Sequence, residues 1–219
     1  MTGDSVENSP LLIDLAFPYR IHDAGGNSRE GLFLLHGSGV DETTLVPLAR
    51  RIAPTAVLVA ARGRIPQEDG FRWFERITPT RFEQRSILAE TAAFAAFANQ
   101  VAKRHRLDLT RATFLGYSNG ANMVSSLMLL HRGIVHRAAL LRPMPVLDDV
   151  PATDLAGTRA LIIAGAADET YGPFAPALVT LLNQRGAEID ARIIPSGHDI
   201  GDLDAAIVRQ WLAGSAALA

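Results

Sequence analysis

Short apolar runs alternate with longer amphipathic stretches along most of the chain. The run at residues 31–35 (GLFLL) is apolar at every position, as a strand buried on both faces of a sheet is. Residues 83–106 instead place apolar side chains on one face at helical spacing. On this basis strands are predicted at residues 11–17, 31–35, 55–60, 112–115, 138–141, 159–164 and 189–194, and helices at 42–52, 83–106, 119–131, 174–185 and 202–212.

This alternation predicts an α/β fold with a mostly parallel sheet covered by helices on both faces. Two segments do not fit either pattern. Residues 61–81 are rich in Arg, Gly and Pro, and residues 142–151 contain several prolines, so both are expected to be irregular. Sheets of this kind place their sites at the carboxyl ends of the strands, so reactive side chains are sought there.

Composition narrows the class of protein further. The chain has 219 residues, 48% of them hydrophobic and 20% charged, which predicts one globular domain over residues 1–219. The net charge of -2 gives no electrostatic reason to expect nucleic acid or a membrane surface as a partner. Without a signal-peptide pattern or an apolar run of roughly 18 residues, a cytoplasmic protein is expected.

The absence of cysteine excludes several chemistries at once. Disulfides, cysteine-based zinc sites, iron–sulfur clusters and a thiolate nucleophile all require it. A metal site around residues 198–204 (HDIGDLD) is not expected either, because no second histidine lies at ligand spacing.

The best candidate nucleophile is Ser118, in the sequence GYSNG at residues 116–120. This sequence fits G-x-S-x-G and lies between a predicted strand and a predicted helix, as a nucleophile elbow requires. The sharp turn strains the serine backbone, and its neighbours two positions away must be small for the turn to close. The alternative interpretation is that Ser118 only caps the helix, since serine is a favoured capping residue.

A serine hydroxyl needs an adjacent base, and the base needs an acid to orient it. Of the six histidines, His198 follows the predicted strand 189–194 and so lies at the carboxyl edge. Asp168 follows the strand 159–164, and the order Ser118, Asp168, His198 is that of the α/β hydrolases. Glu169 and Asp199 are competing acids, and Asp168 is preferred because it lies nearest the strand end.

Chemistry at a carbonyl group also needs donors for the developing oxyanion. The backbone amide of Asn119, next to the nucleophile, is one candidate, and the amide of Ser38 in the loop at 36–39 is the second. Gly39 is the neighbour that could replace Ser38 or contact substrate. His36 is expected to be a buried, hydrogen-bonded loop residue rather than a base.

The aromatic residues of the segment 61–81 allow two interpretations. Trp73 and Phe74, together with Phe71, could line a substrate pocket beside the predicted nucleophile. They could equally be core residues, because large apolar side chains are usually buried.

The motifs together resemble the small bacterial phospholipase/carboxylesterase family of the α/β-hydrolase fold. The resemblance rests on residues 35–39 (LHGSG), residues 116–122 (GYSNGAN), Asp168 and residues 197–198 (GH), and it extends over nearly the whole chain. It implies a serine esterase with no cofactor and no large cap domain. Carried over by position, it assigns the catalytic triad to Ser118, Asp168 and His198, and the oxyanion hole to Ser38 and Asn119.

Two departures from the family bear on substrate. Acyl-thioesterase members usually carry Gln after the nucleophile, where this chain has Asn119. That residue and the segment 62–64 (RGR) are more similar to the bacterial branch that includes hydroquinone-linked hydrolases. The related dienelactone hydrolases use cysteine, which is absent here.

The sequence thus predicts a carboxylesterase that cleaves small esters through an acyl-enzyme, with a small-molecule ester as its partner. The alternatives are a thioesterase or lysophospholipase-type acyl hydrolase, and a non-catalytic binding member of the fold. A homodimer is left open.

Overall fold

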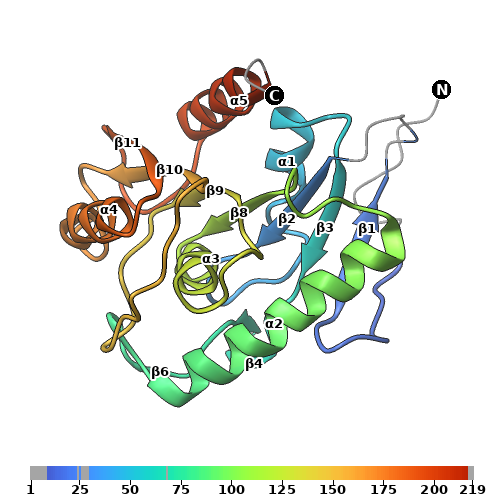
Figure 1. Cartoon of the computed structure of the whole chain (residues 1–219), viewed down its shortest axis with the longest axis horizontal. Coiled ribbons are helices and arrows are strands. Elements are labelled where there is room, and N and C mark those ends of the chain that lie inside the picture. The colour runs from blue at the N-terminus through green and yellow to red at the C-terminus, as the bar shows by residue number, and fades with distance from the viewer. Residues whose placement is uncertain (1–8, 24, 26–29, 68, 217–219) are drawn as a thin grey trace.

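The structure, a computed structural model, describes residues 9–23, 25, 30–67 and 69–216 (Figure 1). In chain order its elements are β1 (Tyr19–His22), β2 (Gly31–Leu35), α1 (Val46–Ile52), β3 (Val57–Ala61), β4 (Ile65–Gln67), β5 (Gly70–Arg72), β6 (Arg76–Thr78), β7 (Arg81–Phe82), α2 (Gln84–His105), β8 (Thr113–Tyr117), α3 (Asn119–Leu130), β9 (Arg137–Leu141), β10 (Arg159–Gly165), the 3-10 turn Gly172–Phe174, α4 (Ala175–Gln184), β11 (Glu188–Ile194) and α5 (Asp202–Ala216).

Seven strands form one continuous sheet in the order β1-β3-β2-β8-β9-β10-β11. Only β1 runs antiparallel to its neighbour, and the other strands pair in parallel. Helices α2, α3 and α4 lie on one face and α1 and α5 on the other (Figure 1). Each face has its own core, because the fully apolar strands β2 and β3 present side chains to both sides. This is the predicted α/β-hydrolase architecture.

The predicted boundaries hold closely where apolar periodicity is strong. The strand at 31–35 is confirmed residue for residue, and the other five predicted strands from 55–60 onward lie within two residues of those observed. The helices predicted at 83–106, 119–131 and 174–185 are confirmed within one residue at each end. The helix predicted at 42–52 begins four residues later, at Val46, because a turn held by the Asp41 carboxylate precedes it.

The strand predicted at residues 11–17 is wrong. Leu12 and Tyr19 exchange backbone hydrogen bonds, so the segment between them folds into a loop that carries the side chain of Phe17 inward. Phe17 is fully buried and its ring contacts Phe94 with centroids 5.1 Å apart. The apolar run therefore reflects burial of one aromatic ring, and the edge strand β1 begins only after Pro18.

The region 61–81 is less irregular than predicted. It contains two short antiparallel hairpins, β4–β5 and β6–β7, between β3 and the long helix α2. Within the described part of the chain these hairpins are the main insertion above the carboxyl edge of the sheet, and no large cap domain is present. The Gly- and Asn-containing sequence of residues 23–29 predicts a turn, and most of this segment lies outside the described residues.

Candidate active site

The turn between β8 and α3 places Ser118 in a strained conformation. Its backbone has φ 52° and ψ -117°, in the left-handed region that residues with a side chain rarely adopt. The flanking positions must be glycine because neighbouring backbone atoms lie too close to leave room for a side chain. A Cβ on Gly120 would lie 2.0 Å from the carbonyl oxygen of Leu35, and one on Gly116 would lie 2.6 Å from the backbone of Ala121. The predicted nucleophile elbow is therefore present.

The geometry decides between a capping serine and a reactive one. Although Ser118 precedes the first residue of α3, its hydroxyl makes no capping hydrogen bond. The hydroxyl oxygen instead lies 2.9 Å from Nε2 of His198. The interpretation of Ser118 as a simple helix cap is therefore not supported.

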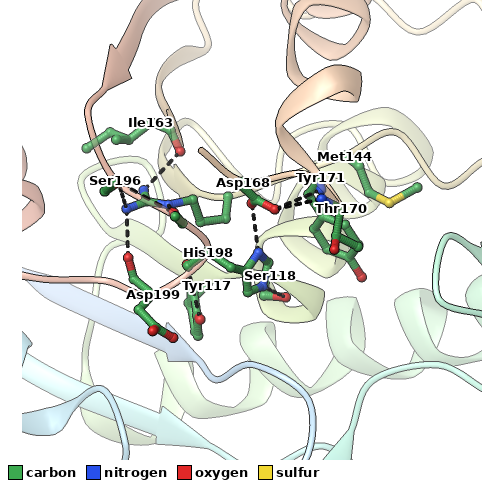
Figure 2. Close-up of polar contacts among 12 residues, drawn as sticks. Tyr117, Ser118, Met144, Ile163, Asp168, Thr170, Tyr171, Ser196, His198 and Asp199 are labelled. Carbon is green, nitrogen blue, oxygen red and sulfur yellow. Dashed lines mark hydrogen bonds and ion pairs between the residues drawn. The ribbon is translucent and has the colours of Figure 1, made fainter. Parts of the chain in front are cut away.

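Three strand ends bring the predicted catalytic side chains together, as Figure 2 shows. Ser118 follows β8, Asp168 follows β10 and His198 follows β11. On the other side of the imidazole, Nδ1 lies 2.7 Å from Oδ2 of Asp168. Because an ionised carboxylate only accepts, Nδ1 carries the proton and Nε2 is free to accept the proton of the serine hydroxyl. Ser118 and Asp168 are both buried, whereas the His198 side chain is 36% exposed.

The environment keeps Asp168 ionised. Burial by itself would raise the pKa of this carboxyl group, but hydrogen bonds from the backbone N–H of Tyr171, from His198 and from the N–H of Thr170 together lower it. Oδ1 accepts from those two N–H groups at 3.0 and 3.1 Å, which leaves Oδ2 for the imidazole.

Neither competing acid takes this place. Glu169 and Asp199 are both exposed, whereas the buried carboxylate of Asp168 is the one that bonds Nδ1 of His198.

Two tyrosines hold the imidazole from its sides. The ring of Tyr171 meets His198 edge to face with centroids 5.1 Å apart, and the ring of Tyr117 lies at 5.5 Å. The hydroxyl of Tyr117 donates to the carbonyl of His198 at 3.3 Å. Burial, reinforced by the charge of Asp199, raises the pKa of Tyr117 to about 12, so this residue acts as a neutral donor.

The residue that sequence reasoning missed is Arg142, which is fully buried directly after β9. Its guanidinium forms a two-point ion pair with Asp204 of α5, at 2.8 and 3.0 Å. The same group donates to the carbonyl oxygens of Gly197 and Asp199 and to the hydroxyl of Ser196. Arg142 therefore binds the backbone on both sides of His198.

A signal for this role exists in the sequence. A charged residue directly follows the buried strand β9, whose last four residues are all apolar. A charge at such a position is seldom buried unless it is paired. Asp204, an acid in the first turn of α5, is 1% exposed and also accepts from the N–H of Gly201. The pairing itself could not be read from two residues that are 62 positions apart.

Both residues predicted to donate to the oxyanion, Asn119 and Ser38, lie beside Ser118. Asn119 is the first residue of α3, so its N–H has no acceptor within the helix and is available beside the nucleophile. Ser38 lines the same cleft as Ser118. The expectation for Gly39 is wrong, because its N–H donates to the carbonyl of Phe71 at 3.0 Å and the residue does not line the cleft.

Buried hydrogen bonds brace the loop that carries Ser38. His36 is 1% exposed, as expected, and its Nε2 accepts from the N–H of Gly63 at 3.0 Å. Its Nδ1 donates to the carbonyl of Gly37, and its own carbonyl accepts from the indole of Trp73. Burial dominates and lowers the pKa of His36 to about 4, so the ring is neutral near pH 7.

The assignment of Trp73 and Phe74 to the substrate pocket is wrong, and the core interpretation holds. Both side chains are fully buried. Trp73 packs against Phe17 and Phe94, and its backbone N–H donates to the side-chain oxygen of Asn119 at 2.8 Å. The two residues therefore support the site from below, because burying such large apolar surfaces in the core is more favourable than exposing them in a cleft.

A cleft of about 330 Å³ opens above the nucleophile. Tyr117 and Tyr171 supply its aromatic walls. The remaining lining residues are Ser38, Arg76, Pro79, Ser118, Thr170 and His198. The aromatic side chains of the cleft thus come from the ends of β8 and the loop after β10, not from the segment in which they were sought.

The strained serine between a parallel strand and a helix, with an acid and a histidine on later strand ends, defines an α/β hydrolase. Comparison with solved structures agrees. A carboxylesterase from Mesorhizobium loti is 86% identical, covers 95% of this chain and 100% of its own, and superposes with a TM-score of 0.93. The Bacillus cereus carboxylesterase is 25% identical, with 92% and 96% covered and a TM-score of 0.88.

Among curated proteins, the chain is 30% identical to "Putative hydrolase MhqD" of Bacillus subtilis (strain 168), over 85% of this chain and 94% of that protein. No family model matches the sequence. The chain belongs to the phospholipase/carboxylesterase family of α/β hydrolases that its motifs resemble, and it is a hydrolase of the carboxylesterase type.

No helix in the described ranges is both long enough and apolar enough to cross a membrane. The same residues contain no group of three or more His, Asp or Glu side chains placed to hold a metal ion.

The buried histidine makes stability depend on pH. The pKa of His36 is about 4 in the folded protein against 6.5 for the free side chain, so between these values only the unfolded state binds the proton. We expect the free energy of unfolding to rise from pH 4 to pH 6.5, with a contribution of about 3 kcal/mol from this residue. The free energy of unfolding, measured with urea at several pH values in this range, should rise less steeply with pH for His36→Gln than for the parent protein. An equal rise in the two proteins would contradict the assignment.

Replacing Arg142 by lysine keeps the charge but removes the planar fork. The bonds to Ser196 and Asp199 and one arm of the Asp204 pair would be lost, at a cost of about 3 kcal/mol or more of unfolding free energy. The matched control is Arg132→Lys, in an ion pair with Asp154 that is more than half exposed on both sides and should change stability by less than about 1 kcal/mol. Equal effects of the two substitutions in thermal unfolding would contradict a supporting role for Arg142.

Proposed function

We propose that this carboxylesterase acts through a Ser118–His198–Asp168 triad and an acyl-enzyme intermediate. The observation that carries the proposal is the unbroken line of hydrogen bonds from Ser118 Oγ to His198 Nε2, at 2.9 Å, and from His198 Nδ1 to Asp168, at 2.7 Å. Such a line activates a hydroxyl that is otherwise a weak nucleophile.

In the first half-reaction Ser118 Oγ attacks the ester carbonyl carbon while His198 Nε2 takes the hydroxyl proton. The N–H groups of Asn119 and Ser38 receive the negative charge that develops on the carbonyl oxygen. The tetrahedral intermediate collapses as the bond to the leaving alcohol breaks, and His198 returns the proton to that alcohol. Asp168 keeps the imidazole in one tautomer and stabilises its positive form.

In the second half-reaction water takes the place of the alcohol. His198 removes a proton from the water, the hydroxide attacks the acyl-enzyme carbonyl, and the bond to Ser118 Oγ breaks. The proton returns to Ser118, and the carboxylic acid leaves. Every proton in the cycle passes through Nε2, so the hydrogen bond from Nδ1 to Asp168 serves both halves.

The cleft supports small esters as substrates. Its volume of about 330 Å³ is near the lower end of the range for small-molecule sites. Hydroxyl-bearing residues and Arg76 line much of it, and they offer little apolar surface to a long acyl chain. A thioesterase or lysophospholipase activity gains no comparable support from this shape.

The nucleophile is tested by Ser118→Ala. Hydrolysis of p-nitrophenyl acetate should fall by at least about 10⁴-fold, because both half-reactions need this oxygen. Labelling by a fluorophosphonate probe should disappear, while thermal unfolding stays near that of the parent protein. Ser125→Ala is the matched control, since its hydroxyl lies on the same helix but bonds only the carbonyl of Asn122.

Retained turnover in Ser118→Ala would show that another group is the nucleophile. A parent protein that is folded but neither labels nor hydrolyses any ester would instead favour the non-catalytic binding alternative.

The size of the cleft is tested with p-nitrophenyl esters of increasing acyl length. We expect kcat/KM to be highest for acetate and butyrate and to fall by more than about tenfold for dodecanoate, because the longer chain would lie outside the cleft in water. A matched oxygen ester and thioester of the same short acid should be compared in parallel. Higher values for the long chain or for the thioester would favour the corresponding alternative hydrolase.

A further inference from the structure

The strand β11 forms an open edge of the central sheet. Within the described residues it pairs only with β10. Glu188 donates its N–H to Thr158, and the carbonyl of Ile194 accepts from Ala166, so the even-numbered residues of β11 face β10. The backbone groups of Ile189, Ala191 and Ile193 therefore point outward, where another strand could pair with them.

The opposite edge of the sheet, formed by β1, is covered by other residues of the chain. There the outward backbone groups of Tyr19 in β1 bond to Leu12 of the preceding segment. The Arg20 side chain of the same strand is held by Glu42. The chain thus covers one edge with its own residues, and the described residues supply no such cover for β11.

The three residues whose backbone groups point outward, Ile189, Ala191 and Ile193, are also apolar. Ile193 is 73% exposed. Beside it a groove of about 780 Å³ runs between β11 and α4, with Ala191, Ile193 and Val179 among its lining residues. Exposed apolar surface of this kind at a sheet edge is typical of an interaction site.

We propose that β11 pairs antiparallel with β11 of a second copy of this chain, about a two-fold axis at Ala191. In this arrangement Ile189 lies opposite the partner's Ile193, and Ala191 lies opposite its own counterpart. These outward-facing residues form hydrogen-bonded pairs, and the two seven-stranded sheets become continuous.

The charges of Asp190 and Arg192 favour this register over the neighbouring ones. Side chains alternate along a strand, so Asp190 and Arg192 project from the same face, and they already form an ion pair within the chain at 2.6 Å. With the axis at Ala191, each Asp190 lies opposite the Arg192 of the second copy. Moving the axis to Asp190 or to Arg192 would place like charges opposite each other, which is unfavourable.

The strand is therefore self-complementary. Edges that avoid association commonly carry charged residues, often lysine, which repel an identical edge. Here the opposite charges two positions apart attract an identical edge, which favours a second copy of this chain as the occupant over an unrelated strand.

The oligomeric state of the full-length protein tests the proposal. Light scattering after gel filtration, at about 1 to 100 µM protein, should give a mass of about twice 23.5 kDa at the higher concentrations. Asp190→Arg and Arg192→Asp should each shift the protein to a monomer, because each places like charges across the axis. The double reversal D190R/R192D should restore the dimer, because it restores both the internal and the intermolecular pairs.

Two further variants separate loss of pairing from loss of fold. Ala191→Pro removes an outward N–H without removing a hydrogen bond to β10, so it should give a folded monomer, as judged by thermal unfolding. Arg132→Asp reverses an exposed charge elsewhere on the surface and should leave the dimer intact.

A parent protein that is monomeric at about 100 µM, or a dimer that survives both single reversals and Ala191→Pro, would overturn the proposal. A folded double reversal that stays monomeric would overturn the pairing of Asp190 with Arg192.

Discussion

The contact between helix α3 and the end of β2 is the constraint on which the site depends. The helix begins so close to Leu35 that a single methyl group on Gly120 would overlap its carbonyl oxygen. Only this approach lets the turn at Ser118 close with its strained backbone and hold the first N–H groups of the helix beside the nucleophile. The strain is sustained because β8 and α3 are each buried almost completely around it.

The other half of the site is held mainly by charge. His198 lies in a loop that follows the edge strand β11, most of which is exposed or half-buried. Arg142 compensates by bonding the backbone on both sides of the histidine from a fully buried position. Its pairing with Asp204 satisfies a charge that would otherwise be costly to bury, and so connects the loop to helix α5.

The segment at residues 62–64 performs a similar task for the loop at 36–39. Arg62 pairs with the buried carboxylate of Glu42, Gly63 donates to His36, and Arg64 pairs with Glu90 of α2. The hairpins that follow β3 are thereby fixed above the sheet. The arginine-rich composition that made this region look irregular is a set of buried and partly buried bonds that hold the site in place.

The sequence by itself determined six of the seven strands of the sheet, the long helices and the three residues that meet at the candidate site, because apolar periodicity and the elbow motif are local in the chain. It did not determine which aromatic residues line the cleft, that Gly39 donates to Phe71, or that Arg142 and Asp204 meet. Those facts depend on the packing of segments tens of residues apart. The sequence immediately around a charged or aromatic residue does not show which distant segment will pack against it. Only the tertiary structure could decide them.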